Sequence, residues 1–124
     1  MEVIVDTNLI IAVIFTDHEN HEEALKAWKG ISKAYLPLIS ITEIAYFLIK
    51  NNLDLGIMNV VLTDPMIEVV SNTTEDILFA AQHKDMISGY DDFNDFLILS
   101  VARRLKLPLL TYDKKLKQKS ANVL

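Results

Sequence analysis

Cysteine is absent from this sequence, and glycine and proline occur only three times each. The absence of cysteine excludes disulfides, zinc–thiolate sites and thiol catalysis, and it fits a reducing compartment such as the cytosol. The small number of glycines and prolines means that few turns interrupt the chain, and no linker or low-complexity stretch is visible. Because 51% of the residues are hydrophobic and 23% are charged, we expect a globular protein.

The sequence also lacks an excess of positive charge and a long hydrophobic run. Its formal net charge is −5, which excludes nucleic-acid binding through a general basic surface. Any such binding would depend on local lysines, or on metal ions that bridge carboxylates and phosphates. The apolar run from Leu9 to Phe15 is far shorter than the roughly 20 residues that span a bilayer, and the first residues lack the basic start of a signal peptide. We expect a soluble, cytoplasmic protein with no membrane partner.

Short apolar segments alternate with amphipathic ones along the 124 residues. The pattern predicts strands at 2–6, 34–36, 67–70 and 108–111 with a final edge strand at 122–124, and helices at 7–15, 19–29, 40–50, 54–63, 74–84, 91–105 and 114–119. Strands that alternate with helices indicate a parallel sheet covered on both faces. The predicted fold is therefore a single α/β domain over residues 1–124, with three α/β/α layers around a central sheet of four or five strands.

Four acidic residues stand where an apolar run meets a turn or a helix start. They are Asp6, Glu43, Asp95 and Asp113. In a parallel α/β sheet, ligands bind beyond the carboxyl ends of the strands, and all four junctions can lie on that edge. Carboxylates gathered in one place repel one another unless a cation neutralises them. The pattern therefore predicts a divalent-metal site, and with it phosphate chemistry.

Each acid also has a local structural explanation. Asp6 and Asp113 could cap the helices that follow them, and Ser40-x-x-Glu43 matches a capping box. Asp95 could be an acid favoured in the first turn of a helix. Taken singly, capping explains each position about as well as metal binding does.

The surroundings of Asp95 favour the metal site over capping. This acid is followed by the apolar segment Phe96–Leu99, and no lysine or arginine lies near it in the sequence. A partly buried charge needs a partner. Asp91 and Asp92, four and three residues earlier, add negative charge to the same helix, and one of them shares the face of Asp95.

The ordered set of motifs resembles the PIN-domain ribonucleases, of the small kind that serves as the VapC-type toxin in toxin–antitoxin pairs. The matching segments are Val5–Ile10, Ser40–Ile44, Asp95–Ala102 and Leu107–Asp113, and the resemblance covers essentially the whole chain. Two details depart from the commoner pattern. Tyr112 stands where many relatives carry arginine or asparagine, and the pair Asp91-Asp92 adds acids before the third motif.

The resemblance implies a metal-dependent endoribonuclease that cleaves RNA with a metal-activated water. Asp6, Asp95 and Asp113 would hold one or two Mg2+ or Mn2+ ions, and Glu43 would complete the cluster or orient the water. The other candidate site residues are Asp91 or Asp92 as an additional ligand, Thr7, Asn8 and Thr111 as groups that hold the carboxylates in place, and Lys114, Lys115 and Arg103 as RNA contacts. The alternatives are an ordinary strand threonine at Thr111, a bond from Asn8 to the adjacent turn, and a solvated helix face for the basic residues. The implied partners are RNA, a cognate antitoxin and a second copy of the chain.

Two other functions are compatible with parts of the pattern. A phosphohydrolase that forms an aspartyl phosphate also has an aspartate after its first strand. The haloacid-dehalogenase type needs a second aspartate two residues on, where this chain has Asn8, and a response-regulator receiver needs an early acidic pair that is absent here. A catalytically inactive PIN-like module that only binds RNA or protein is the other alternative, and the complete set of four acids argues against it.

Overall fold

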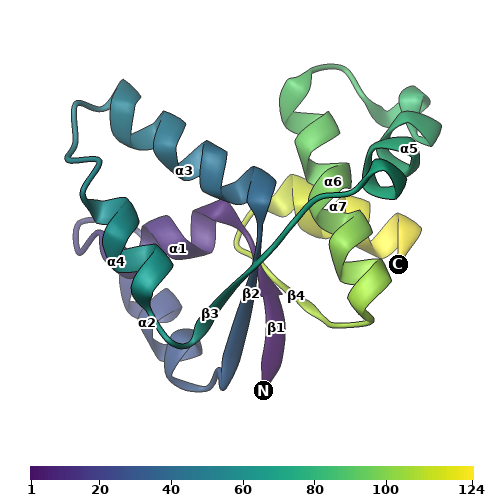
Figure 1. Ribbon diagram of the computed structural model, residues 1–124. Helices are drawn as coiled ribbons and strands as arrows, with labels where there is room; N and C mark the ends of the chain where they lie inside the picture. The colour runs from purple at the N-terminus through teal and green to yellow at the C-terminus, as the bar shows by residue number, and fades with distance from the viewer.

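The computed structural model describes residues 1–124, and it confirms the predicted α/β/α fold with a four-stranded parallel sheet (Figure 1). The strands are β1 (Glu2–Val5), β2 (Lys33–Pro37), β3 (Ile67–Val70) and β4 (Leu109–Leu110). The helices are α1 (Thr7–Ile14), α2 (His21–Lys29), α3 (Leu38–Lys50), α4 (Ile57–Thr63), α5 (Thr74–Gln82), α6 (Tyr90–Leu105) and α7 (Lys114–Val123), with a short 3-10 turn at Lys84–Met86. None of these helices combines the length and the apolar character that crossing a bilayer requires.

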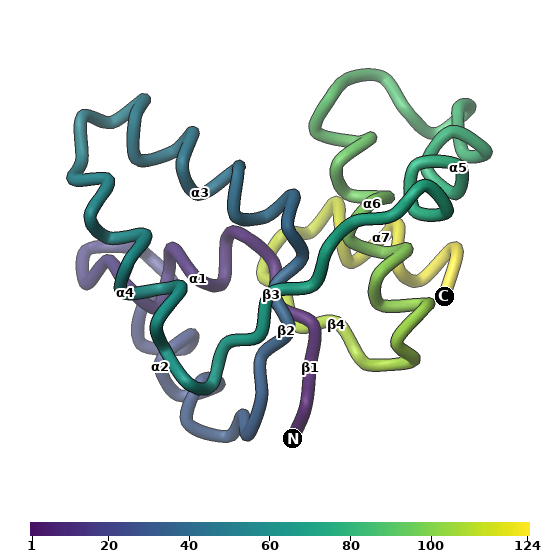
Figure 2. The backbone as a smooth tube through the Cα atoms, viewed as in Figure 1, coloured from purple at the N-terminus to yellow at the C-terminus, as the bar shows by residue number.

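The order of the strands across the sheet is β3-β2-β1-β4, and every pairing is parallel. The chain moves outward from β1 to β2 and β3, and then returns from α6 to place β4 on the other side of β1 (Figure 2). The direction of winding therefore reverses between β1 and β4. In parallel α/β sheets the crevice at this switch point is where ligands bind.

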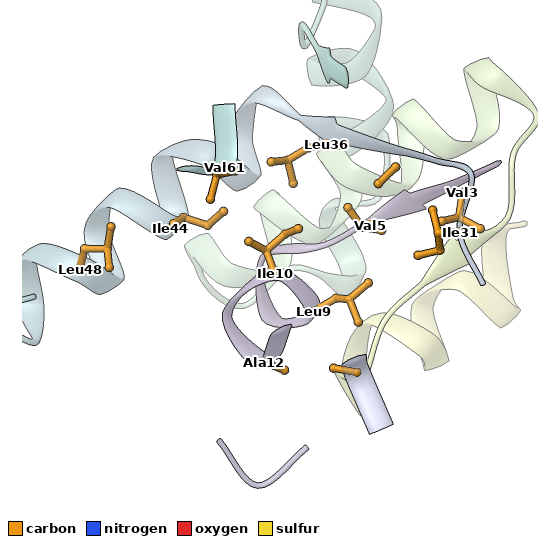
Figure 3. Packing of buried hydrophobic residues seen from close by; sticks show 12 residues of the cluster. Val3, Val5, Leu9, Ile10, Ala12, Ile31, Leu36, Ile44, Leu48 and Val61 are labelled. Atoms are coloured by element: carbon orange, nitrogen blue, oxygen red, sulfur yellow. The ribbon is translucent and has the colours of Figure 1, made fainter. Parts of the chain in front are cut away.

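The sheet separates two hydrophobic clusters because successive side chains of a strand point to opposite faces. Val3 and Val5 of β1 belong to a cluster with residues of α1 to α4, whereas Ile4 between them packs with residues of α5 to α7. Figure 3 shows the first cluster, where side chains from β1, α1, β2, α3 and α4 meet. In Figure 1 the two groups of helices lie on opposite sides of the sheet.

Several predicted boundaries were off by one to three residues, and two further differences concern elements beside the edge of the sheet. Residues 122–124 do not form an edge strand, because α7 continues to Val123, whose side chain packs against the second cluster. The helix expected from Ser40 begins at Leu38, directly after Pro37. Pro37 has an extended backbone and ends β2, so Ser40 lies inside the first turn of α3 and not at its N-cap. The earlier start of α3 places Glu43 in its second turn.

Candidate functional site

A pocket of about 400 Å³ opens at the carboxyl ends of β1 and β4, between α1, α3, α6 and α7. Six acidic residues line it: Asp6, Glu43, Asp91, Asp92, Asp95 and Asp113. The four acids selected from the sequence therefore lie around one pocket and are not scattered over different faces. Four residues of the lining are hydrophobic, and Lys115 is its basic residue.

Asp6 lies at the base of this arrangement and is almost completely buried, with 2% of its surface exposed. Its Oδ1 accepts a hydrogen bond of 2.9 Å from the backbone N–H of Leu9, so it caps α1, and its Oδ2 accepts one from the Thr111 hydroxyl. Burial raises the pKa of this carboxyl to about 6 in spite of these bonds, and the negative charges of Asp113 and Asp95 act in the same direction. No lysine, arginine or histidine forms a salt bridge with Asp6.

Thr111 connects the end of β1 to the segment that follows β4. Its hydroxyl donates to Asp6 and accepts a 2.9 Å hydrogen bond from the backbone N–H of Asp113. Asp113 caps α7 as expected, because its Oδ1 accepts hydrogen bonds from the backbone N–H groups of Lys115 (2.9 Å) and Leu116 (3.3 Å). The Asp113 Oδ2 makes no hydrogen bond within the chain, so capping leaves one of its oxygens available.

Glu43 does not form the capping box suggested by the spacing from Ser40. It lies in the second turn of α3, where its Oε1 accepts a 2.7 Å hydrogen bond from the Thr7 hydroxyl and its Oε2 accepts one of 3.4 Å from the Asn94 side chain. The Ser40 hydroxyl is fully buried and has no hydrogen-bond partner. Bonds from Thr7 and Asn94 thus hold Glu43 at the pocket from two different helices.

Asp95 has a basic partner after all, which corrects the expectation from the sequence. It lies in the second turn of α6, and the Lys119 ammonium of α7 is 2.8 Å from its Oδ2 and 2.8 Å from Oδ1 of Asp92. Burial nevertheless raises the pKa of Asp95 to about 6, with the charges of Asp113 and Glu43 acting in the same direction. The bonds from Lys119 and Ser88 lower the pKa of Asp92. The negative charge expected to need a metal ion is therefore neutralised in part by a lysine.

The remaining predicted residues divide into those at the pocket and those away from it. Asn8, Asp91 and Lys115 line it, and the Asn8 side chain makes no hydrogen bond within the chain. Lys114 is exposed on the first turn of α7 and is not among the lining residues. Arg103 lies on a different cavity, with its guanidinium carbon 5.2 Å from the centre of the Phe79 ring. The structure therefore brings Lys115, but not Arg103, to the acids.

Sequence reasoning missed Asn94 and the pairing of Lys119. Lys119 is 7% exposed and shares the buried face of α7 with Leu116, three residues earlier. A lysine in the register of an apolar stripe is a signal of burial against an acid. The predicted helix ended at Lys119. The apolar stripe of α7 continues to Val123, so the position of Lys119 within that stripe was not recognised.

The donor set is suited to a hard divalent cation. Every carboxylate of the pocket offers oxygen ligands, which Mg2+ and Mn2+ prefer. Burial raises the pKa values of Asp6 and Asp95, so added positive charge would stabilise both ionised carboxylates. No three acidic or histidine side chains are already arranged around a common point as a preformed metal site requires. Water molecules would supply the remaining ligands of an ion bound in this pocket.

A sequence model of the PIN domain matches residues 3–122 of the chain. The chain belongs to the PIN domain family, which confirms the resemblance seen in its motifs. No curated protein sequence matches the chain.

Solved structures of VapC toxins share the fold. VapC20 of Mycobacterium tuberculosis, a toxin that cleaves the sarcin–ricin loop, superimposes with a TM-score of 0.81 at 15% identity, over 94% of each chain. A chain of a toxin–antitoxin complex from Klebsiella pneumoniae gives a TM-score of 0.67 at 18% identity, over 91% of this chain and 88% of that one. VapBC2 of Rickettsia felis, bound to a DNA fragment of its promoter, gives 0.65 at 18% identity, over 95% and 92%.

Proposed function

We propose that this protein is a divalent-metal-dependent endoribonuclease and the toxin of a toxin–antitoxin pair. The observation that carries the proposal is the pocket at the switch point of the sheet, where buried Asp6 and half-buried Asp95 face Glu43 and Asp113. Such a cluster is suited to hold a cation against a phosphate. Membership of the PIN family and the fold shared with VapC20, which is itself a toxin that cleaves the sarcin–ricin loop, support the same activity.

In this proposal Asp6, Asp95 and Asp113 hold Mg2+ or Mn2+ with the help of water ligands. A bound ion of this kind lowers the pKa of its water and neutralises the charge that develops on the phosphate. Glu43, fixed by the Thr7 hydroxyl at 2.7 Å, orients the attacking water. Because water is the nucleophile and the ribose 2′-hydroxyl takes no part, the products carry a 5′-phosphate and a 3′-hydroxyl.

RNA reaches an acidic protein through local positive charge. Lys115 lines the pocket beside the acids, and Lys114 precedes it on the exposed first turn of α7. Their ammonium groups draw the phosphate backbone toward the carboxylates. These contacts fix the position of the backbone and carry no base specificity by themselves.

The proposed partners are a cognate antitoxin and a second copy of the chain, in the cytoplasm. The Klebsiella pneumoniae and Rickettsia felis structures are toxin–antitoxin assemblies, which supports the antitoxin. On α3, the Tyr46 and Ile49 side chains are 66% and 61% exposed, and uncovered apolar side chains of this kind suit a protein interface.

The experiment is an RNA-cleavage assay on the purified protein with Mn2+ and with excess EDTA. Cleavage that requires the metal and is lost in Asp6→Asn and Asp113→Asn, with 5′-phosphate ends on the products, is the expected result. Asp85→Asn is the matched control, because Asp85 is an exposed acid outside the pocket that makes no hydrogen bond through its side chain. Cleavage that persists in EDTA, or in Asp6→Asn, would contradict the proposal. Binding of RNA without cleavage would identify the protein as a catalytically inactive PIN-like module.

A further inference from the structure

Lys119 lies behind the acidic pocket. Its side chain is 7% exposed, and it approaches Asp92 and Asp95 from the α7 side, at 2.8 Å from an oxygen of each. It is not among the residues that line the pocket, whereas both of its carboxylate partners are. Leu116, one turn earlier on α7, is 1% exposed and anchors this face of the helix in the second hydrophobic cluster. The position of the ammonium is therefore set by the packing of α7.

An account of the oxygen atoms shows which carboxylates remain available to a cation. Both oxygens of Asp92 are used, because Oδ1 accepts from Lys119 and Oδ2 accepts from the backbone N–H (2.9 Å) and hydroxyl (2.8 Å) of Ser88. Asp95 and Asp113 each keep one oxygen without a hydrogen bond, namely Oδ1 and Oδ2 respectively, and exposed Asp91 keeps both. Each oxygen of Glu43 accepts one hydrogen bond. Both oxygens of Asp6 accept one hydrogen bond and retain a lone pair.

Asp6, Asp95 and Asp113 together suit one ion. Mg2+ takes about six oxygen ligands, of which one or two are usually carboxylates and several are water. The free oxygens of Asp95 and Asp113, with the remaining lone pairs of Asp6, meet that need once. A second ion between Asp92 and Asp95 would have to take Asp92, whose oxygens are already bonded, and it would be repelled by the ammonium of Lys119.

We propose that Lys119 is a built-in cation of the pocket that takes the place of a second metal ion, so that the pocket binds a single divalent ion. This inference rests on the proposed metal-dependent function. Lys119 is a positioning residue in this scheme: it holds Asp92 and Asp95 in place and keeps Asp92 out of the coordination sphere. The ammonium of Lys119 is 2.8 Å from an oxygen of Asp92 and 2.8 Å from an oxygen of Asp95, and two carboxylates at this distance supply the partners that a buried charge needs.

The test is the number of Mn2+ ions bound per chain, measured by isothermal titration calorimetry on metal-stripped protein. Wild type is expected to bind one ion. Lys119→Met keeps the bulk of the buried stem and removes the charge, so it is expected to bind two ions, with magnetic coupling between them in the Mn2+ EPR spectrum. Combining Lys119→Met with Asp92→Asn removes the released carboxylate and should return the count to one.

Two further variants control for charge and for folding. Lys115→Met removes an exposed lysine of the pocket lining and should leave the count at one, as should Lys119→Arg, which keeps the buried charge. Asp92→Asn alone tests the inference even when Lys119→Met fails to fold, because a residue that is not a ligand leaves the Mn2+ affinity within about threefold of wild type.

Each outcome has a defined meaning. Two ions in wild type, or one ion in both wild type and folded Lys119→Met, would overturn the inference and leave the proposed nuclease standing. A tenfold or larger loss of Mn2+ affinity in Asp92→Asn would also overturn it. Absence of Mn2+ binding in every variant would overturn the metal-dependent function together with the inference.

Discussion

Replacing Asp6 with asparagine should stabilise the metal-free protein at neutral pH while removing its proposed activity. Burial raises the pKa of Asp6 from 3.8 to about 6. Because this pKa is higher in the folded than in the unfolded chain, the carboxyl supports folding fully below about pH 3.8, and this contribution is lost as the pH rises through about 6. A pKa shift of about two units corresponds to about 3 kcal/mol of folding stability that wild type loses at pH 8. Asp6→Asn, whose side chain does not ionise, would regain this stability.

The loss of a carboxylate oxygen reduces this gain. Asparagine has one acceptor oxygen, whereas Asp6 uses two to accept from the Leu9 N–H and the Thr111 hydroxyl. Losing one of these bonds costs about 1 kcal/mol. The variant is therefore expected to be more stable than wild type by about 2 kcal/mol at pH 8, which raises the melting temperature of a chain of this size by about 8 °C. At pH 4 the gain disappears, and the variant is expected to be less stable by about 1 kcal/mol.

The measurement is thermal unfolding followed by circular dichroism in EDTA at pH 4 and pH 8. Asp91→Asn serves as the control, because an exposed side chain without hydrogen bonds changes stability by less than about 0.5 kcal/mol. Saturating Mn2+ should stabilise wild type by mass action and leave Asp6→Asn almost unchanged. An Asp6→Asn protein that is less stable than wild type at pH 8 would refute the reasoning, because it would mean that ionised Asp6 is satisfied by its hydrogen bonds alone.

Three other substitutions test separate parts of the structure. Thr111→Val removes a hydroxyl that serves both Asp6 and the Asp113 backbone, so we expect a loss of about 2 kcal/mol in the free energy of unfolding by urea. Asp76→Asn breaks a fully buried carboxylate's 3.0 Å pair with Arg104, outside the acidic pocket, and should cost about 3 kcal/mol. Because the Asp76 pKa is lowered, by bonds from Arg104 and Ser100 that outweigh burial, its contribution is present above about pH 3.8 and is lost as the pH falls. Lys115→Ala should raise the KM for RNA several-fold, weaken its salt dependence and leave kcat unchanged.

Each of these three has a matched control elsewhere in the chain. Thr42→Val removes an exposed hydroxyl bonded to a backbone carbonyl and should change stability little, so an equal loss in Thr42→Val and Thr111→Val would contradict the first prediction. Glu75→Gln changes an exposed neighbour of Asp76, and its stability should match wild type at every pH. Lys26→Ala removes an exposed lysine of α2, which contributes no residue to the pocket, and a KM shift as large as that of Lys115→Ala would show a general charge effect.

The acidic set could be predicted because each of its members is tied to a local pattern. Asp6 follows three apolar residues of a buried strand, and Asp113 follows the short strand β4. In a parallel sheet such ends meet at one edge regardless of the details of packing. The alternation of strands and helices determines this edge, and for that reason the fold and the convergence of Asp6 and Asp113 could both be inferred without coordinates.

The partners of the acids could not be predicted in the same way. The spacing of Ser40 and Glu43 matched a capping box, but α3 begins directly after Pro37. Ser40 therefore lies in the first turn of α3 and Glu43 in the second. Lys119 meets Asp95 across 24 residues, through the packing of α7 on α6. Such a contact depends on the angle between two helices, which no local pattern encodes. The sequence therefore predicted where the negative charge lies, but not what neutralises it.

The pocket draws its walls from both sides of the sheet. Glu43 and Thr7 come from helices packed on the first cluster, whereas Asp95 and Lys119 come from helices packed on the second, and the 3.4 Å contact between Glu43 and Asn94 crosses from one to the other. The spacing of the carboxylates therefore depends on how the two helical halves are seated against each other. A bound protein that shifted one half against the other would change the spacing of the carboxylates, and with it the proposed cleavage, without entering the pocket.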